Sequence, residues 1–237
     1  LMGRGYERNL VYMESHKGVN VVSQAKRIKE IFVDFEADYL VLDLANSGIG
    51  IYDSLTQVLQ HEERGIIVPA YTIVDDVFLT IDDKLRNDLT NRTLGLGAIP
   101  VIFPIQASQV LNSHIAVTFR SSLQKKLWNF LIDENEAEEF LIRNNREFVS
   151  DSTNSDITVH YLSPYLQQSL LIGECVNLEM SLVNGNIRLQ ERPGLYKDRF
   201  SAVSYANYFI NFLDKSLLQE TEDHNAYAEV IGVTMVV

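Results

Sequence analysis

Two aspartates stand beside apolar stretches that are expected to be buried, and their carboxylates are the first candidates for chemistry. Asp43 lies in the run 40–45, which is too short and too continuously apolar for anything but a central strand. An ionised carboxylate there is costly unless a positive charge compensates it. Asp198 begins a segment with apolar residues at helical spacing. One carboxylate at a strand end and another in the first turn of a helix suit metal-dependent phosphoryl transfer.

Asp43 also has a structural explanation. Its carboxylate could cap the turn that follows, through Asn46 and Gly48, because aspartate commonly serves turns. The Gly-Ile-Gly segment at 48–50 favours the chemical interpretation, since it would let a phosphate or an ion approach the backbone where the next helix begins. The sequence leaves both interpretations open.

The structural explanation for Asp198 is that acids at a helix start are favoured by the helix macrodipole. Lys197 and Arg199 flank this aspartate, and they could either neutralise it or contact a phosphate group. Two aspartates alone form a weak motif, so neither explanation is decided by these residues.

Three further acids are accessory candidates for the same site. Glu14 stands at the end of an expected strand, where it could point towards the same sheet edge as the site, but a place at the rim is the simpler interpretation. Asp53 is expected in the first turn of a helix, where acids are ordinary. Glu174 lies in an otherwise apolar stretch and is expected to be half-buried, which is unusual for a glutamate.

The sequence lacks the motifs of several other kinds of site. Its five histidines are scattered, and its single cysteine, Cys175, can form neither an internal disulfide nor a thiolate metal site. This cysteine usage fits a reducing compartment. The chain has no nucleophile elbow, no glycines at the Rossmann spacing and no P-loop, so ATP hydrolysis by a P-loop mechanism is excluded.

Composition limits the possible partners. At 237 residues and 46% hydrophobic, the chain can bury a full core, either as one domain with a large insertion or as two domains. No apolar run is long enough to cross a bilayer, so no membrane is expected. The formal net charge of -12 counts against tight stand-alone binding of DNA, because nucleic-acid binders are usually basic. It is compatible with a carboxylate-rich metal centre, whose ions invert the local charge.

Alternating strand and helix patterns over the first 75 residues predict an α/β fold with a right-handed crossover. We expect strands at 9–15, 39–45 and 68–71, a helix capped by Ser23, and a helix at 51–59. The apolar stripe of the first helix is expected to be Ala25, Ile28, Phe32 and Phe35, and the residues outside it to be Lys26, Lys29 and Glu30.

The pattern is looser from about residue 75 onward. Residues 92–104 are rich in Gly and Pro, and 121–148 are expected to be helical, with the acidic run 133–139 facing water. A polar loop is expected at 149–156, and then a helix or strand at 170–178. The turn Asn184-Gly185-Asn186 is expected to lead into a β element at 187–189. A helix from Asp198 closes the fold, and the state of the Val-rich tail after residue 220 is left open.

Four stretches of the chain together resemble one known family. They are Gly5-Tyr-Glu-Arg-Asn-Leu-Val-Tyr-Met-Glu-Ser, Phe32-Val-Asp-Phe-Glu-Ala-Asp-Tyr, Val41-Leu-Asp-Leu-Ala-Asn-Ser-Gly-Ile-Gly and Tyr196-Lys-Asp-Arg-Phe-Ser-Ala-Val-Ser-Tyr-Ala-Asn. In order and content they resemble the C-terminal nuclease domain of tailed-bacteriophage terminase large subunits. The resemblance extends over nearly the whole chain and is least specific at 92–192.

The resemblance implies an RNase H-like α/β fold, in which helices flank a central mixed sheet and a long insertion precedes the last helix. The domain would span 1–219, with the insertion at about 92–192 and a C-terminal tail at 220–237. The family binds two Mg²⁺ or Mn²⁺ ions through a cluster of acids. Asp43 resembles the acid of the central strand, and Asp198 resembles the acid of the last helix. We expect the family's first acid, and its ATPase motor domain, upstream of Leu1.

The implied activity is that of a metal-dependent endonuclease that cuts concatemeric double-stranded viral DNA during genome packaging in the host cytoplasm. Two ions roughly 3.5–4 Å apart would activate a water and stabilise the leaving oxygen, with Asp43 bridging them and Asp198 binding one. Lys197 and Arg199 would contact DNA phosphates. The implied partners are the motor domain, the portal and the small terminase subunit. Two alternatives stay open: a catalytically incomplete docking or assembly module with the same fold, and another RNase H-like enzyme, a resolvase or transposase.

Overall fold

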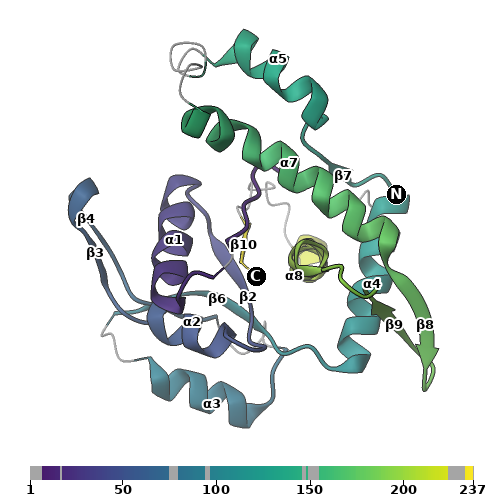
Figure 1. The fold of residues 1–237 in the computed structure, drawn as a ribbon. Coiled ribbons are helices and arrows are strands. Elements are labelled where there is room, and N and C mark those ends of the chain that lie inside the picture. The colour runs from purple at the N-terminus through teal and green to yellow at the C-terminus, as the bar shows by residue number, and fades with distance from the viewer. Residues whose placement is uncertain are drawn as a thin grey trace. The chain divides into compact units, whose positions relative to one another are not determined.

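The computed structural model describes residues 7–16, 18–74, 80–93, 97–145, 148, 155–223 and 233–236. The chain forms two compact units, whose helices and strands are labelled in Figure 1. The sheet unit comprises Gly18–Thr118 and Ser201–Val237, and the hairpin unit comprises Leu1–Lys17 and Phe119–Phe200. The boundaries at 118–119 and 200–201 fall inside the helices α4 (Gln109–Gln124) and α8 (Asp198–Asp223).

Four parallel strands form the main sheet of the sheet unit in the part of the chain that the structure describes. Their order is β10 (Val233–Val236), β2 (Tyr39–Asp43), β6 (Ile99–Ile105) and β5 (Tyr71–Ile73). Each neighbouring pair runs parallel, and the register places Leu42 opposite Pro104. The expected α/β class is confirmed. The described strands of this sheet all run in one direction, so they do not show the mixed sheet that was expected. The RNase H-like fold stays a prediction.

Strand β2 is apolar on both of its faces, as expected for a central parallel strand. Leu40 and Leu42 join a buried cluster with residues of α1 (Val21–Asp34), α2 (Gly48–Leu55) and α3 (Asp83–Arg92). Val41 points to the opposite face and joins a second cluster with residues of β6, α4 and α8. Helices therefore pack on both faces of the sheet, and the strand that ends at Asp43 lies between two cores.

Helix α1 begins two residues before the expected cap. Its N-cap is Asn20, whose side-chain oxygen accepts a hydrogen bond from the backbone N–H of Ser23 at 2.9 Å. The expectation that Ser23 itself caps the helix is therefore wrong. Asn20 has the extended backbone that an N-cap requires, whereas Ser23 is already helical.

Two residues in and after α1 have the opposite burial from that expected. Lys29 is only 1% exposed, and Phe35 is 45% exposed. The Lys29 ammonium donates to the carbonyls of Gln57 at 2.5 Å and Pro69 at 2.7 Å, and these acceptors allow it to be buried. Phe35 follows the last helical residue, so it no longer lies on the helical stripe.

The segment after β2 has different element boundaries from those expected. Helix α2 ends at Leu55, and the antiparallel pair β3 (Leu59–His61) and β4 (Ile66–Val68) follows, joined by the 3-10 turn η1 (Glu62–Arg64). The expected strand at 68–71 is divided at Pro69, because proline has no N–H to donate to a ladder. Residues 74–80, where the pattern loosened, lie partly outside the described residues.

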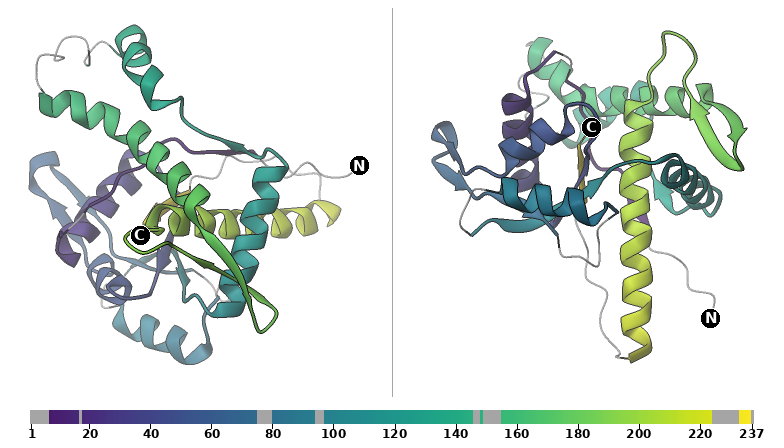
Figure 2. Two further views of the ribbon diagram at one scale, coloured as in Figure 1. Left: turned by 45° about the vertical axis from the view of Figure 1, so that its right-hand side comes forward. Right: turned by 90° about the horizontal axis from the view of Figure 1, so that it is seen from below.

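Helix α8 is one continuous helix, and Figure 2 shows it along its length. Within the sheet unit, its Phe209 is fully buried and packs edge-on against Tyr39 and tilted against Phe103, at ring-centroid distances of 5.1 and 4.5 Å. These aromatic contacts attach α8 to β2 and β6. The expected helix from Asp198 is confirmed.

Among its described residues, the hairpin unit contains short strands, the helices α5 (Glu134–Asn144) and α7 (Ser155–Asn177), and the adjoining ends of α4 and α8. The strand β1 (Arg8–Asn9) pairs in parallel with β7 (Trp128–Asn129). The strands β8 (Glu179–Val183) and β9 (Asn186–Gln190) form an antiparallel hairpin whose turn residues, Asn184 and Gly185, have φ of 51° and 78°. This is the turn that Asn-Gly predicts, and the expected β element is confirmed.

Other sequence expectations for the hairpin unit need correction. The strand expected at 9–15 is only the two-residue β1. The helix expected at 121–148 ends at Gln124, because Lys126 adopts a positive φ of 55°, and a new helix begins at Glu134. The segment 170–178 is the end of the helix α7. Most of the expected loop at 149–156 lies outside the described residues.

The segment 92–192, expected to be an insertion, belongs to both units. It supplies β6 and most of α4 to the sheet unit, and it supplies α5, α7 and the β8–β9 hairpin to the hairpin unit. The tail beyond residue 220 contributes β10 to the main sheet. The two units are thus divided at 17–18, 118–119 and 200–201.

Candidate functional site

Asp43 ends β2 and begins a tight turn into α2. Its Oδ1 accepts a hydrogen bond from the backbone N–H of Ala45 at 2.9 Å. The turn is closed by a backbone bond from Gly48 N–H to the Ala45 carbonyl at 2.8 Å, and Asn46 adopts a φ of 51°. Asp43 therefore does cap the turn, through one of its two carboxylate oxygens, but the capped N–H belongs to Ala45 and not to Asn46 or Gly48, as the sequence had suggested.

The glycines at 48 and 50 have packing reasons. A Cβ on Gly48 would lie 1.9 Å from the backbone oxygen of Asp43, closer than any real Cβ contact. A Cβ on Gly50 would touch the side chain of Val21, on the neighbouring helix α1, at 3.6 Å. Gly48 thus allows α2 to begin directly against the end of β2, and this close approach sets where the Asp43 carboxylate lies.

The electrostatic environment of Asp43 disfavours its charge. Burial raises the pKa of the carboxyl group, and the hydrogen bond from Ala45 only partly offsets this. Within the described residues, no lysine or arginine pairs with Asp43. Tyr205 of α8 lies in the same unit, and its own burial, followed by the charge of Asp43, raises the pKa of its phenol to about 12. The tyrosine hydroxyl also donates to Asn112 at 3.4 Å, a long hydrogen bond.

Asp198 is the first residue of α8, and its side chain is exposed. Among the described residues it has no hydrogen-bond or ion-pair partner. Its neighbour Lys197 pairs with Glu191 at 3.0 Å and also donates to the Leu189 carbonyl at 3.3 Å. The carboxylate of Asp198 is thus available for a ligand, whereas the predicted phosphate contact Lys197 is already engaged.

Glu174, the expected half-buried glutamate, has a side chain that is 8% exposed. Its Oε1 accepts from Arg199 Nη1 at 2.7 Å, and its Oε2 accepts from the backbone N–H of Phe200 at 2.9 Å. Arg199 also donates from Nε to Gln167 at 2.7 Å. The second predicted phosphate contact, Arg199, is therefore held against α7 in this arrangement.

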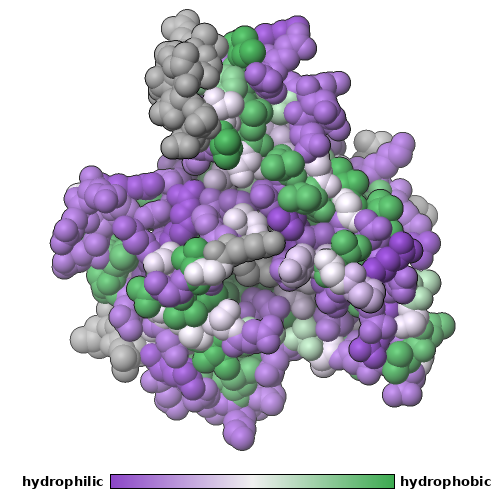
Figure 3. All heavy atoms as spheres, in the orientation of Figure 1, coloured by the Kyte–Doolittle hydropathy of each residue, from purple (hydrophilic) through white to green (hydrophobic). Residues whose placement is uncertain are grey.

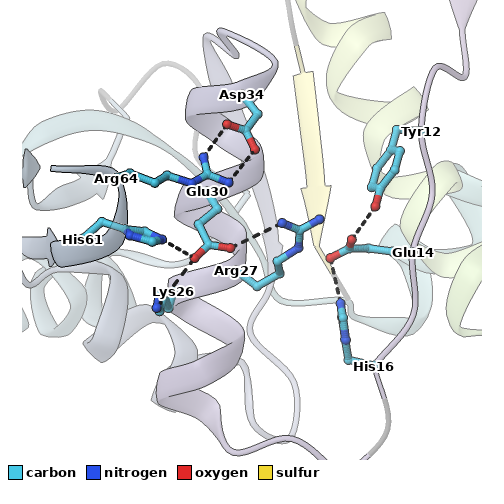
Figure 4. Close-up of polar contacts among 9 residues, drawn as sticks. All are labelled: Tyr12, Glu14, His16, Lys26, Arg27, Glu30, Asp34, His61 and Arg64. Carbon is cyan, nitrogen blue, oxygen red and sulfur yellow. Dashed lines mark hydrogen bonds and ion pairs between the residues drawn. The ribbon is translucent and has the colours of Figure 1, made fainter. Parts of the chain in front are cut away.

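The two remaining accessory acids have partners of their own. Glu14 accepts hydrogen bonds from the Tyr12 hydroxyl and from His16, both at 2.7 Å (Figure 4). Asp53 pairs with Arg92 at 3.1 Å. Because α2 begins at Gly48, Asp53 lies in the second turn of this helix and not in the first, as the sequence had suggested.

The two principal acids belong to different units of the chain. Asp43 is in the sheet unit, and Asp198 and Glu174 are in the hairpin unit. Within the described part of the chain, no three acids, histidines or cysteines gather into a group that could hold a metal ion. The expected approach of Asp43 to Asp198 stays a prediction.

Sequence reasoning missed a set of hydrogen bonds that join acids of α1 to residues of β3 and η1. His61 of β3 is 4% exposed, and its Nε2 lies 2.8 Å from Glu30, whose pKa is lowered by the hydrogen bonds from His61 and Arg27 despite its burial. Arg64 forms a two-pronged pair with Asp34 of the same helix (Figure 4). His61 and Arg64 lie 31 and 30 positions from the acids that they contact, so no local sequence pattern indicates these two contacts.

In comparisons with known proteins, no protein-family model, no curated protein and no solved structure matches the chain. In the described part of the chain, no helix is both long and apolar enough to span a bilayer. The function is therefore inferred from the residues and the geometry of the chain itself.

Proposed function

We propose that this chain is a metal-dependent endonuclease domain, with an RNase H-like fold, of the kind found in phage terminase large subunits. In this proposal Asp43 and Asp198 provide carboxylate oxygens to Mg²⁺ or Mn²⁺. Carboxylates are the ligands that these hard ions prefer. The substrate would be double-stranded viral DNA, and the partners an ATPase motor domain, a portal and a small terminase subunit.

The observation that carries the proposal is the state of Asp43. This carboxylate ends a central strand, burial raises its pKa, and no basic side chain among the described residues compensates its charge. A bound divalent cation would supply that compensation and lower the cost of burial. The exposed carboxylate of Asp198, which has no partner among the described residues, is equally suited to a metal ion.

The chemistry follows from this assignment. Bound metal ions would activate a water for attack on a phosphodiester and stabilise the oxygen that leaves. The residues of the chain would hold the ions, with Asp43 fixed by the turn at Ala45 and Asp198 fixed by the start of α8. Because the ions would contact phosphates and no base edges, cutting should depend little on DNA sequence.

A titration with Mn²⁺ alone tests the proposal. Asp43→Asn and Asp198→Asn should each weaken Mn²⁺ binding by at least about tenfold, since each removes one charged ligand. Asp83→Asn removes an exposed helix-start aspartate that is 89% accessible, and it should leave Mn²⁺ affinity unchanged. DNA cleavage by the protein should require Mn²⁺ or Mg²⁺ and be lost in both site variants. Equal Mn²⁺ affinity in all three variants would refute the assignment of the site.

The second candidate is a catalytically incomplete docking module, and an exposed apolar strip favours it. The cross-strand pairs Met180–Leu189 and Leu182–Ile187 give the β8–β9 hairpin one apolar face, and Met180 and Leu182 are 60% and 72% exposed. Hydrophobic residues are visible over this hairpin in Figure 3. Exposed apolar strips of this kind commonly mark interaction surfaces. A docking module without a working site would not take up Mn²⁺ in the titration above.

A further inference from the structure

The side chain that directly precedes the helix α8 cannot cap it. The residue before Asp198 is Lys197, whose ammonium has donors only and cannot accept a hydrogen bond from the first-turn N–H groups. Helices usually place Ser, Thr, Asp or Asn at that position, because the side-chain oxygen accepts from the second or third helical N–H. The first turn of α8 therefore needs an acceptor from elsewhere in the chain.

Glu174 of α7 supplies that acceptor. Its Oε2 accepts from the backbone N–H of Phe200, the third residue of α8, at 2.9 Å. Its Oε1 accepts from Arg199 Nη1 at 2.7 Å, and the Glu174 and Arg199 side chains are 8% and 16% exposed. Both oxygens of Glu174 are thus bound to the first turn of α8, and the carboxylate lies at the positive end of the helix macrodipole.

Arg199 extends this attachment along α7. Its Nε donates to the side-chain oxygen of Gln167 at 2.7 Å. Gln167 and Glu174 are 174 − 167 = 7 residues apart, or about two turns, and so lie on the same face of α7. Charge-assisted hydrogen bonds between partly buried groups are stronger than those at an open surface. The turn that carries Asp198 is therefore held to α7 by three side-chain hydrogen bonds.

We infer that Glu174 and Arg199 are positioning residues that fix the Asp198 carboxylate for metal binding. The inference rests on the proposed function. Asp198 directly precedes Arg199, and its side chain has no partner among the described residues, so the backbone of this turn alone directs it. Glu174 acts here through Asp198 and is not itself a metal ligand, since both of its oxygens are engaged.

Amide hydrogen exchange of the chain, read residue by residue by NMR, tests the positioning directly. Glu174→Gln should reduce the protection of the Phe200 amide by roughly tenfold, the factor that corresponds to about 1.4 kcal/mol, because the charged acceptor is lost. The matched control is Glu179→Gln, which removes the same charge from an exposed glutamate paired with Arg192. Unchanged protection at Phe200 in Glu174→Gln would overturn the inference.

A milder variant covers the case in which Glu174→Gln fails to fold. Arg199→Lys keeps the positive charge but cannot reach Glu174 and Gln167 at once, because lysine lacks the planar fork of arginine. It should loosen the first turn of α8 by less than Glu174→Gln, with far-UV circular dichroism unchanged. Full protection of the Phe200 amide in Arg199→Lys would show that Arg199 has no part in positioning.

Titration with Mn²⁺ links the turn to the metal. Groups that orient a metal ligand typically change metal affinity 10- to 100-fold, so Glu174→Gln should weaken Mn²⁺ binding by about tenfold and Glu179→Gln should not. If Asp198→Asn weakens binding and Glu174→Gln does not, this inference fails while the proposed function stands. If Asp198→Asn itself has no effect, the proposed site is wrong, and the positioning role falls with it.

Discussion

Two charged side chains of the sheet unit lie in apolar surroundings and are stabilised in different ways. Asp43 accepts one backbone N–H, and burial raises its pKa. Lys29 donates to two carbonyls, lies 4.7 Å from the ring centroid of Tyr71, and has its pKa lowered by burial to about 8. Neither has a charged partner among the described residues. At both positions, protonation is therefore coupled to folding stability.

For Asp43→Asn without metal, we expect the melting temperature at pH 7 to hold or to rise. The folded-state pKa of Asp43 is raised, so its contribution to stability is present below the unfolded-state pKa and is lost as pH rises through the folded-state value. Asparagine does not ionise, so the variant keeps this stability at pH 7. Its melting temperature should therefore exceed that of the unaltered chain least at about pH 3, where Asp43 is protonated in both states. The measurement is thermal unfolding at both pH values with Asp83→Asn as the control. A clear drop at pH 7 would show that Asp43 serves mainly the turn at Ala45.

Lys29→Met should remove a pH dependence of stability at alkaline pH. Burial lowers the folded-state pKa of Lys29 from its ordinary value of 10.5 to about 8, so between these pH values the unfolded chain binds more protons and stability rises with pH. The full rise is on the order of 3 kcal/mol. Denaturant titrations at pH 7.5 and 10 measure it. The control is Lys26→Met on the same helix, whose lysine is 45% exposed. An equal rise in Lys29→Met and in the unaltered chain would contradict the prediction.

At the scale of elements, the position of the Asp43 carboxylate depends on how closely α2 follows β2. At Gly48, where α2 begins, a hydrogen fits against the Asp43 carbonyl but a Cβ does not. Helix α8 depends in the same way on a neighbouring element, because Glu174 of α7 caps its first turn. Each principal acid is therefore oriented by a contact that its own element does not provide.

Gly48→Ala should destabilise the sheet unit by about 2 kcal/mol or more, because its Cβ would lie 1.9 Å from a backbone oxygen that cannot move aside cheaply. Gly173→Ala is the matched control. Gly173 lies inside α7, a Cβ there meets nothing within 4 Å, and alanine should stabilise the helix by about 0.5–1 kcal/mol. Urea unfolding measures both changes. Similar free energies for the two variants would mean that α2 tolerates a shift away from β2.

At the scale of the whole molecule, the acidic charge limits what the chain can bind. The formal net charge is -12, and the basic residues near Asp198 are engaged in ion pairs. Lys125 and Lys126 are the only adjacent pair of lysines. Few phosphates can therefore be neutralised, and in the proposed function a motor domain would hold the DNA while this domain cuts it.

The chain by itself should bind duplex DNA weakly and with a shallow dependence on salt. Each phosphate contact contributes about one unit to the slope of log affinity against log salt, so a slope of small magnitude is expected. Titration of the chain with duplex DNA at near-physiological salt, and again at lower salt, measures it. A dissociation constant well below about 10⁻⁶ M, the tight end of non-specific binding, would show that this chain holds the DNA itself.

The amino-acid sequence determined the features that depend on neighbours in the chain. The apolar run 40–42 is fully buried as a central strand, Asn184-Gly185 makes the hairpin turn, and a helix begins at Asp198. Each of these rests on a local signal: a continuous apolar run, a dipeptide that tolerates positive φ, or a helical period. The turn at Asp43 and Gly48 was also within reach of local reasoning, since the two residues are five positions apart.

The tertiary structure decided the features that depend on distant residues. Lys29 is buried because the carbonyls of Gln57 and Pro69, 28 and 40 positions away, meet its ammonium. Glu174 accepts a hydrogen bond from the first turn of α8, 26 positions away. The segment expected to be an insertion belongs to two units, because its strand β6 pairs within the main sheet. A polar group is buried where its hydrogen-bond partners happen to converge, and a sequence does not show which distant partners do so.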